Sequence, residues 1–339
     1  IEGVSILGPS KDAAKRLNNK ALQVSGLKDI VPVVDFKICE GYDELIRTTD
    51  SLWNKWTDGI FVTAAYSAAG INSVVAFSKE TILDKFKNLD DTYVITRFLP
   101  HMYDPTVLGI VANEEEIYIA GVADQCIENG NRFTGSTFPT VLQTSLVKKL
   151  EKHTRDAGSW LAKNGYRGIF GCDYIVTEQN DIHFLEINAR KQGTTLEFCC
   201  TLEQNLPAHA PNLPELEFYA VTQEIFPANT IELRSNPKNI HWGTYNYKIH
   251  DTVKTQNYIP QRVGEQKAFK KIANGNLKKD FLILEHTGSD FVIAQGSFIA
   301  RIVSLGQDHK SVAQGIDLGC KTIELTFTKE IFTEKENAS

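Results

Sequence analysis

The sequence lacks any run of 18 or more apolar residues, and its start shows no signal-peptide pattern. A transmembrane helix needs about 20 consecutive, predominantly apolar residues. A secretory signal combines a basic start, a short apolar stretch and a cleavage site of small residues. We therefore expect a cytoplasmic protein with no membrane partner.

The sequence also lacks an excess of positive charge and cysteine motifs. The formal net charge is −6 at pH 7, and a chain of this sign is not attracted to nucleic acid or to an anionic membrane. The six cysteines show no C-x-x-C spacing, so neither a zinc site nor a disulfide framework is predicted. They are Cys39, Cys126, Cys172, Cys199, Cys200 and Cys320.

The sequence does have an ordinary globular composition. Its 339 residues are 42% hydrophobic and 23% charged, which is typical of folded domains. A chain of this length can build two or three domains with substantial cores.

The chain is organised around a predicted β-hairpin. Two runs rich in β-forming residues, 169–177 and 182–188, are separated by the polar residues 178–181. If those four residues form the loop, Asp173 lies opposite Glu186 on the neighbouring strand.

The second strand of this hairpin carries polar groups on one side. The two-residue period of a strand places Glu186, Asn188 and Arg190 there. Facing carboxylates repel unless a cation lies between them, and Mg²⁺ is usually held by one or two carboxylates together with nucleotide phosphates. The hairpin is therefore either a magnesium site or an edge hairpin whose polar side faces water.

The spacing from Asp173 to Glu186-x-Asn188-x-Arg190 resembles the metal-binding hairpin of the ATP-grasp superfamily, the carboxylate–amine ligases and their relatives. The resemblance implies that Asp173, Glu186 and Asn188 coordinate two Mg²⁺ ions that bridge the phosphates of ATP. It also implies that Arg190 contacts a phosphate or an acyl-phosphate intermediate.

The start of the chain predicts a helix that begins after Ser10, a good N-cap residue. The apolar residues that follow recur at helical spacing: Ala14, Leu17, Ala21 and Val24. Lys20 lies off this stripe, toward solvent or toward a ligand. The stretch ILGPSKDAAKRLNNK resembles the helix that leads into an ATP-grasp domain, which implies that Lys20 touches nucleotide phosphates and takes part in catalysis.

Two predicted strands, 60–66 and 73–78, flank a loop of small residues. Small side chains let backbone N–H groups approach an anion, so the loop is either an ordinary turn or the phosphate-covering lid that the resemblance implies. Nucleotide contacts are expected from Thr63 and from the loop residues Ser67, Ala68, Ala69 and Gly70. The family commonly has a Lys where this chain has Thr63, which supplies no charge to a phosphate.

The strand predicted at 92–99 leads into the segment where the family binds adenine. Arg97, Phe98 and Leu99 span this hinge, whose backbone reads the adenine edge. Asp104 is the nearest carboxylate able to accept from a ribose hydroxyl, or else it begins the turn at Pro105.

Two further segments are candidates for substrate binding. Residues 130–139 form a Gly-rich stretch in which Arg132 and Ser136 either grip a carboxylate or acyl phosphate or belong to a plain connection. Arg301 is a charge inside a predicted apolar strand, where it either faces the active cleft or is an ordinary surface residue.

The predicted fold class is α+β: an ATP-grasp fold of two α+β subdomains that grip nucleotide, with a smaller C-terminal α+β domain. The expected ATP-grasp domain spans 1–224, with a lid subdomain at about 58–95. The C-terminal domain spans 225–330, and residues 331–339 are expected to form a disordered tail. The domain that usually precedes an ATP-grasp domain is expected to be missing: either it was removed, or it sits on a separate chain, or the protein does without it. The expected protein partner is a second copy of the chain or a separate N-terminal-domain partner.

The resemblance implies an ATP- and Mg²⁺-dependent ligase that joins a small-molecule carboxylate to an amine through an acyl phosphate and releases ADP. The product could include a peptide bond. Three alternatives stay open at this stage. The chain is a non-catalytic or partner-dependent ATP-binding module, a structural subunit whose hairpin acids are merely solvated, or a kinase of the same fold.

Overall fold

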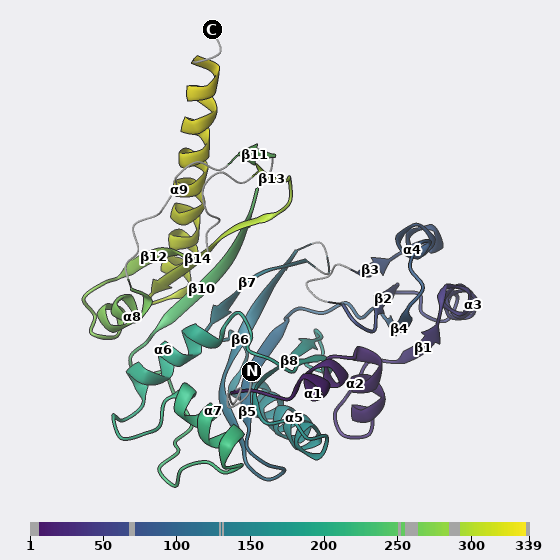
Figure 1. The fold of residues 1–339 in the computed structure, drawn as a ribbon, viewed down its shortest axis with the longest axis horizontal. Helices are drawn as coiled ribbons and strands as arrows, with labels where there is room; N and C mark the ends of the chain where they lie inside the picture. The colour runs from purple at the N-terminus through teal and green to yellow at the C-terminus, as the bar shows by residue number, and fades with distance from the viewer. Residues whose placement is uncertain are drawn as a thin grey trace, which may run out of the picture. The chain divides into compact units, whose positions relative to one another are not determined.

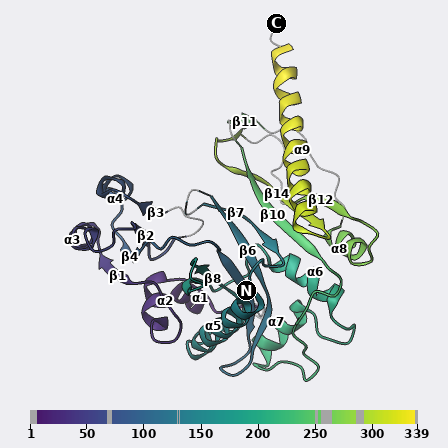
Figure 2. The same ribbon diagram turned by 180° about the vertical axis from the view of Figure 1, so that it is seen from behind.

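The computed structural model describes residues 7–67, 72–128, 130, 132–249, 252–254, 264–284 and 292–336 (Figures 1 and 2). The chain divides into two compact units. The first unit comprises Ile1–Phe133, Thr140–Leu202 and Leu206–Leu233, and the second comprises Thr134–Pro139, Glu203–Asn205 and Arg234–Ser339. The division at residue 224 stays a prediction, because these units describe compactness and not independent folding.

The first unit contains a four-stranded antiparallel sheet with the strand order β1-β4-β2-β3. Its strands are β1 (Phe36–Glu40), β2 (Ile60–Ala64), β3 (Ser73–Ala76) and β4 (Thr92–Arg97). Helices α3 (Tyr42–Trp53) and α4 (Lys79–Phe86) pack their apolar sides on one face. The predicted pair of strands on either side of the small-residue loop is confirmed, with Thr63 opposite Ser73.

The first unit also holds four antiparallel strands in the order β6-β5-β8-β9. They are β5 (Pro105–Val111), β6 (Ile117–Glu128), β8 (Gly168–Val176) and β9 (Ile182–Asn188). Helix α5 (Thr144–Lys163) covers one face and joins the largest apolar cluster of this unit. Helices α6 (Thr195–Asn205) and α7 (Leu213–Thr222) follow the hairpin.

The start of the chain forms two helices where the sequence predicts one. Ser10 caps α1 (Lys11–Leu17) as predicted, since its side chain accepts from the Ala13 N–H. The helix then ends, and the side chain of Asn19 accepts from the Leu22 N–H to begin α2 (Lys20–Leu27). The apolar spacing continues across this break, because α2 still turns Ala21 and Val24 toward the sheet. Periodicity alone therefore could not reveal the break.

Gln23 fixes α2 to the edge strand of the hairpin. Its side chain is buried, donates to the carbonyls of Leu17 and Ile187 at 2.7 and 2.8 Å, and accepts from the Ile187 N–H at 2.8 Å. The amide thus satisfies both backbone groups of one residue in β9, as a neighbouring strand would. This contact determines where the first turn of α2 lies against the hairpin.

The prediction of a Gly-rich loop at 130–139 is wrong for most of that stretch, because it forms the strand β7 (Arg132–Phe138). A Cβ atom on Gly135 would lie 1.8 Å from the carbonyl oxygen of Thr244. Glycine is therefore needed here for close contact between two backbones, as it is in some strands, and not for a flexible loop.

The second unit is built on strands in the order β12-β14-β10-β7. Its further elements are β10 (His241–Lys248), β11 (Val253–Lys254), α8 (Glu265–Ala273), β12 (Lys279–Leu284), β13 (Val292–Ile293), β14 (Phe298–Gly306) and α9 (His309–Glu336). Residues 331–336 are helical in α9, which differs from the expected disordered tail, and residues 337–339 lie outside the described residues. Within the described ranges, no helix is both long and apolar enough to cross a bilayer.

We predict that Gln23→Ala destabilises the first unit by about 2–4 kcal/mol, because it leaves buried backbone groups of Ile187 without partners. Denaturant unfolding of wild type and variant measures the difference. Ser25→Ala, on the exposed side of the same helix, is the control and should stay within about 0.5 kcal/mol of wild type. Equal stability of the two variants would contradict the role given to Gln23.

Candidate active site

The predicted hairpin and its register are confirmed, with the first strand one residue earlier at each end than predicted. Strands β8 and β9 pair antiparallel, and Asp173 lies directly opposite Glu186. The loop contains Asn180 in the left-handed conformation, at φ 65°, which Asn tolerates better than most residues. The register shifts by one residue just after Asp173, so that Leu185 is an extra residue in β9. Such a bulge re-aims neighbouring side chains.

Asp173 is buried, with 6% of its surface exposed. Its Oδ1 accepts from the Thr106 hydroxyl at 2.7 Å, and its Oδ2 accepts from the Asn188 side-chain amide at 2.8 Å. Burial raises the pKa of Asp173, and hydrogen bonds from Thr106, Asn188 and Gln125, together with the charge of Lys20, oppose that rise. The carboxylate is therefore held in place by neutral donors, with a cation close by.

Gln192 completes the surroundings of Asp173. Its Nε2 lies 3.2 Å from the Thr106 hydroxyl and 3.4 Å from Asp173 Oδ1. A Cβ atom on Gly171 would lie 1.9 Å from the Gln192 side-chain carbonyl carbon, so the carboxamide occupies space that only glycine leaves. The Gln192 Oε1 is buried and has no hydrogen-bond partner among the described residues, which leaves an oxygen ligand unused beside the carboxylate.

Lys20, the first residue of α2, forms an ion pair with Glu186. The two side chains are 16% and 31% exposed. Burial lowers the pKa of Lys20 to about 8; the charge of Asp173 opposes this effect and that of Arg190 reinforces it. The ammonium group is therefore close to both carboxylates of the hairpin, where a cation is needed to offset their repulsion.

Arg190 follows β9 and continues the polar row. Its Nη2 donates to Asn188 Oδ1 at 2.9 Å, and its Nη1 donates to the Lys191 carbonyl at 3.2 Å. Arg190 is exposed, whereas Asn188 is buried. The hydrogen bonds thus run from an exposed guanidinium through Asn188 to the buried carboxylate of Asp173.

The donor set of this site fits magnesium bound together with phosphates. Carboxylate and amide oxygens are the ligands that Mg²⁺ accepts, and it commonly takes only one or two carboxylates from the protein. The unpartnered oxygen of Gln192 is consistent with that fit. Among the described residues, no three His, Cys, Asp or Glu side chains form a metal-binding group, so the nucleotide would supply the remaining ligands. Two Mg²⁺ ions stay a prediction.

The predicted lid residues are partly described. Thr63 is 5% exposed, and its hydroxyl lies 2.7 Å from the Ser67 hydroxyl and 3.3 Å from the Ala64 carbonyl oxygen. Ala68, Ala69 and Gly70 lie outside the described residues. The position where the family commonly has a Lys therefore holds a hydroxyl that is already hydrogen-bonded.

The predicted adenine hinge follows β4. The Arg97 N–H donates to the Asp35 carbonyl and the Phe98 N–H to the Gly59 carbonyl, both at 3.0 Å, which fixes the backbone before Leu99. The Arg97 side chain pairs with Asp58 at 2.5 Å. This guanidinium is thus paired with an acid outside the hairpin.

Asp104 lies 3.0 Å from His101 Nε2, a partner that the sequence analysis missed. Since Asp104 is the last residue before β5, the turn role and the ribose role remain compatible with its position.

The predicted substrate residues are not gathered in one loop. Arg132 begins β7 and lies 3.8 Å from the Glu128 carboxylate. Ser136 and Arg301 belong to the second unit, where they are 1% and 6% exposed. The alternatives of a plain loop for Ser136 and an ordinary surface position for Arg301 are therefore both wrong.

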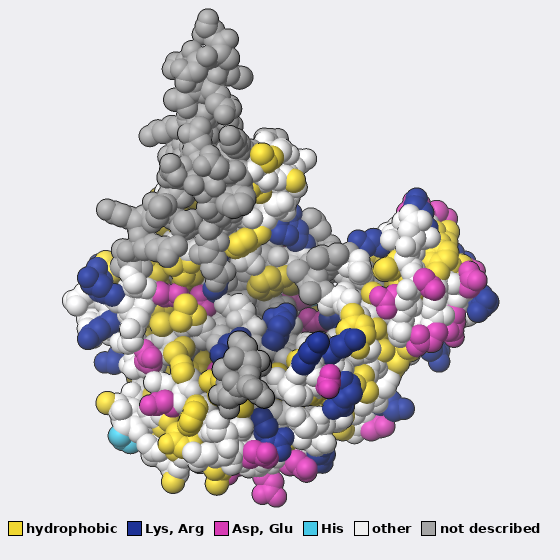
Figure 3. All heavy atoms as spheres, in the orientation of Figure 1, with side chains coloured by type: hydrophobic (Ala, Val, Ile, Leu, Met, Phe, Trp, Pro, Cys, Tyr) yellow, Lys and Arg dark blue, Asp and Glu magenta, His cyan; other side chains and the backbone are white. Residues whose placement is uncertain are grey.

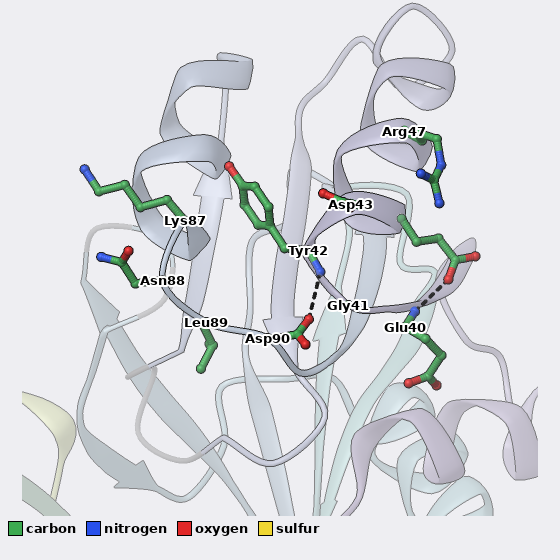
Figure 4. Close-up of a pocket in the computed structure, with 10 residues that line it drawn as sticks. Glu40, Gly41, Tyr42, Asp43, Arg47, Lys87, Asn88, Leu89 and Asp90 are labelled. Atoms are coloured by element: carbon green, nitrogen blue, oxygen red, sulfur yellow. Dashed lines mark hydrogen bonds between the residues drawn. The ribbon is translucent and has the colours of Figure 1, made fainter.

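A separate cavity of about 440 Å³ lies in the first unit at the start of α3 and contains none of the predicted site residues (Figure 4). Asp90 and Glu44 line it, and they accept from the N–H groups of Tyr42 and Glu40 at 3.3 and 2.8 Å. Acidic and basic side chains are interspersed over α3 and α4 in Figure 3. Asp90 satisfies the first N–H of a helix whose N-cap, Gly41, has no side chain to do so, and Glu44 satisfies the last residue of β1.

The fold and the hairpin define a class of protein. Residues 60–194 match the family model of the ATP-grasp domain. The described elements are mixed helices and antiparallel sheets, so the predicted α+β ATP-grasp fold is confirmed.

Known proteins resemble the chain at low identity. Formate-dependent phosphoribosylglycinamide formyltransferase of Wolinella succinogenes is 21% identical over 200 residues, which are 57% of this chain and 49% of that protein. The butirosin acyl-carrier protein–L-glutamate ligase of Niallia circulans is 29% identical over 92 residues, 27% of this chain and 22% of the ligase. The aligned regions thus span about half or less of these relatives.

Among solved structures, biotin carboxylase of Campylobacter jejuni in a beta-gamma-ATP complex matches with a TM-score of 0.65 and 16% identity. The match covers 90% of this chain and 66% of that one. At this identity it establishes a shared fold.

We predict that wild type loses stability relative to Asp173→Asn as the pH rises above 3.8. Burial raises the pKa of Asp173 above that ordinary value, so the native state holds its proton more tightly than the unfolded state, and ionisation at higher pH costs the native state free energy. The variant has no charge to bury. Denaturant unfolding from pH 4 to pH 7 without Mg²⁺ measures the difference.

The control is Asp181→Asn, an exposed acid in the loop of the same hairpin. Its stability relative to wild type should show no comparable trend. A difference between wild type and Asp173→Asn that is flat, or that changes in the opposite direction, would show that the carboxylate is not destabilised by burial.

Proposed function

We propose that this chain uses ATP and Mg²⁺ to join a carboxylate to an amine through an acyl phosphate, with release of ADP. The observation that supports this best is the pair of facing carboxylates, Asp173 and Glu186, with Lys20 and Arg190 beside them. Buried charges of both signs in one site are costly to keep and are common at functional sites.

Asp173, Glu186 and Asn188 would hold Mg²⁺, which, when bound, neutralises charge on a phosphoryl group during transfer. Lys20 pairs with Glu186, and on binding of nucleotide it would exchange that partner for a phosphate. Arg190, already exposed at the end of the row, would stabilise charge on the acyl phosphate.

The reaction proceeds in two displacements. A carboxylate oxygen of the substrate attacks the terminal phosphorus of ATP, the bond to the bridging oxygen breaks, and ADP leaves. The amine nitrogen then attacks the acyl carbon, the carbon–oxygen bond to phosphate breaks, phosphate leaves, and the nitrogen loses a proton. The protein's contribution is chiefly positioning and charge stabilisation.

The relatives suggest which carboxylates to try. One is named for formate and another for L-glutamate. We propose a small carboxylate and a small-molecule amine as substrates, and an amino acid as the carboxylate would make the product a peptide or amide.

A second candidate function is nucleotide binding without ligation by this chain alone. Thr63, whose hydroxyl is bonded to Ser67, supports it, because it brings no cation to the phosphates. This candidate differs from the first in one measurable respect: a binding module releases no ADP with any amine, whereas a ligase requires both substrates and a kinase requires a hydroxyl acceptor instead.

We predict that Mg²⁺ with a non-hydrolysable ATP analogue stabilises wild type and stabilises Glu186→Gln much less. At about a hundred times its dissociation constant, a ligand that binds only the folded state adds about 2.7 kcal/mol. Thermal unfolding with and without ligand measures the effect. Glu178→Gln, in the exposed loop of the same hairpin, should respond as wild type does, and a wild type without response would remove the nucleotide-binding proposal.

We predict that ADP release by wild type requires Mg²⁺, a carboxylate and an amine together. A coupled assay for ADP, run with formate and L-glutamate against a panel of amines, measures it. Glu186→Gln should lower the rate at least 10²-fold, the usual scale for loss of one group that stabilises transition-state charge. Nucleotide binding with no ADP release under any combination would favour the binding module.

A further inference from the structure

His101 connects the two parts of the predicted nucleoside-binding segment. Its Nδ1 lies 2.7 Å from the carbonyl oxygen of Leu99, the last residue of the predicted adenine hinge. Its Nε2 lies 3.0 Å from Oδ1 of Asp104, the predicted ribose acceptor. The imidazole is partly buried, at 18% exposure. One ring therefore touches both the hinge and the carboxylate.

Both partners of the ring can only accept hydrogen bonds. A backbone carbonyl has no proton, and an ionised carboxylate has none either. Neutral imidazole carries one N–H, so it can satisfy only one of the two contacts, whereas imidazolium satisfies both. The two distances thus call for the charged form of His101. The hydrogen bond that the ring donates to Asp104, with help from the one to the Leu99 carbonyl, raises the pKa of His101 against the effect of burial.

The groups around the ring favour this state. Phe98 packs its ring edge-to-face against His101 at 6.3 Å between centroids, and Phe77 packs on Phe98 at 5.6 Å. Asp104 is the charged group that faces the imidazole. On the neighbouring strand β6, burial raises the pKa of the Cys126 thiol, and the charges of Asp124 and Asp104 add to this effect. An ion pair that packs against an aromatic ring is screened less than an ion pair surrounded by water.

The backbone on either side of the ring is already fixed. The Phe98 N–H donates to the Gly59 carbonyl, and the Gln125 N–H donates to the Asp104 carbonyl at 2.8 Å. What remains free at Asp104 is the rotation of its side chain. His101 holds Oδ1 and leaves Oδ2 for a ligand hydroxyl.

We propose that His101 is a positioning residue that ties the adenine hinge to the ribose-binding carboxylate, and that it does so only as imidazolium. This inference rests on the proposed function, since it concerns how the same site binds nucleotide. Loss of the proton breaks one of the two contacts. Either Asp104 then rotates freely or the hinge carbonyl loses its partner, and nucleotide affinity falls.

The test compares the dissociation constant of a Mg²⁺-bound, non-hydrolysable ATP analogue for wild type and His101→Gln from pH 6 to pH 9. At pH 6 the variant should bind about 5- to 10-fold more weakly, the scale of one typical intramolecular hydrogen bond. The ratio of the two dissociation constants, variant over wild type, should approach one as the pH rises through the pKa of His101. Lys20 titrates in the same range, but it is present in both proteins, so the ratio cancels its effect.

Two further variants make the result specific. Asp104→Asn should lose a similar amount of affinity, and adding His101→Gln to it should cost little more, because both changes break the same link. His209→Gln, an exposed histidine far along the chain, should bind as wild type does at every pH. Thermal unfolding of each variant shows whether it is folded before its affinity is compared.

The outcomes separate this inference from the proposed function. Suppose that wild type binds nucleotide. If the ratio of the dissociation constants of His101→Gln and wild type is near one at pH 6, or does not change with pH, the role of His101 is overturned and the proposed function stays intact. Wild type that binds no nucleotide at any pH overturns both. Additive losses in the double variant also overturn the link.

Discussion

A buried carboxylate must be surrounded by donors and lie near a positive charge, and the hairpin region of this chain is arranged around that constraint. Asp173 receives hydrogen bonds from Thr106 and Asn188, and Gly171 leaves the space in which Gln192 reaches it. None of these donors is charged. The cation comes from Lys20, on a helix that the chain forms about 150 residues earlier.

Burying the charged Lys20 costs free energy, and the same burial lowers its pKa to about 8. Its place is maintained by the backbone and not by the ion pair alone. The Lys20 N–H donates to the Ala65 carbonyl at 2.9 Å, and Gln23, one turn later, binds both backbone groups of Ile187. The helix thus joins the four-stranded sheet β1-β4-β2-β3 to the hairpin, so a change in either would move the ammonium group.

The sequence predicted the contacts that depend on local spacing and missed those that depend on distant segments. Alternation and a four-residue loop were enough to pair Asp173 with Glu186. Nothing in the period of a strand reveals that Gln192 or Thr106 reaches the same carboxylate. The Thr106 contact follows from the pairing of β5 with β8, and the Gln192 contact follows from the path of the chain after β9. The break before Lys20 was hidden for the opposite reason: the apolar spacing runs through it, and only the capping by Asn19 marks the new helix.

The replacement of a family Lys by Thr63 changes how charge can be balanced at this site. At the hairpin itself, the cations Lys20 and Arg190 only offset the acids Asp173 and Glu186, so these four side chains would bring no net positive charge to a polyphosphate. Thr63 adds none, since its hydroxyl is bonded to Ser67. If the chain binds ATP as proposed, neutralisation of the phosphates would fall to metal ions and to backbone dipoles. Nucleotide binding would then depend more strongly on Mg²⁺ than in a site where a lysine stands at this position.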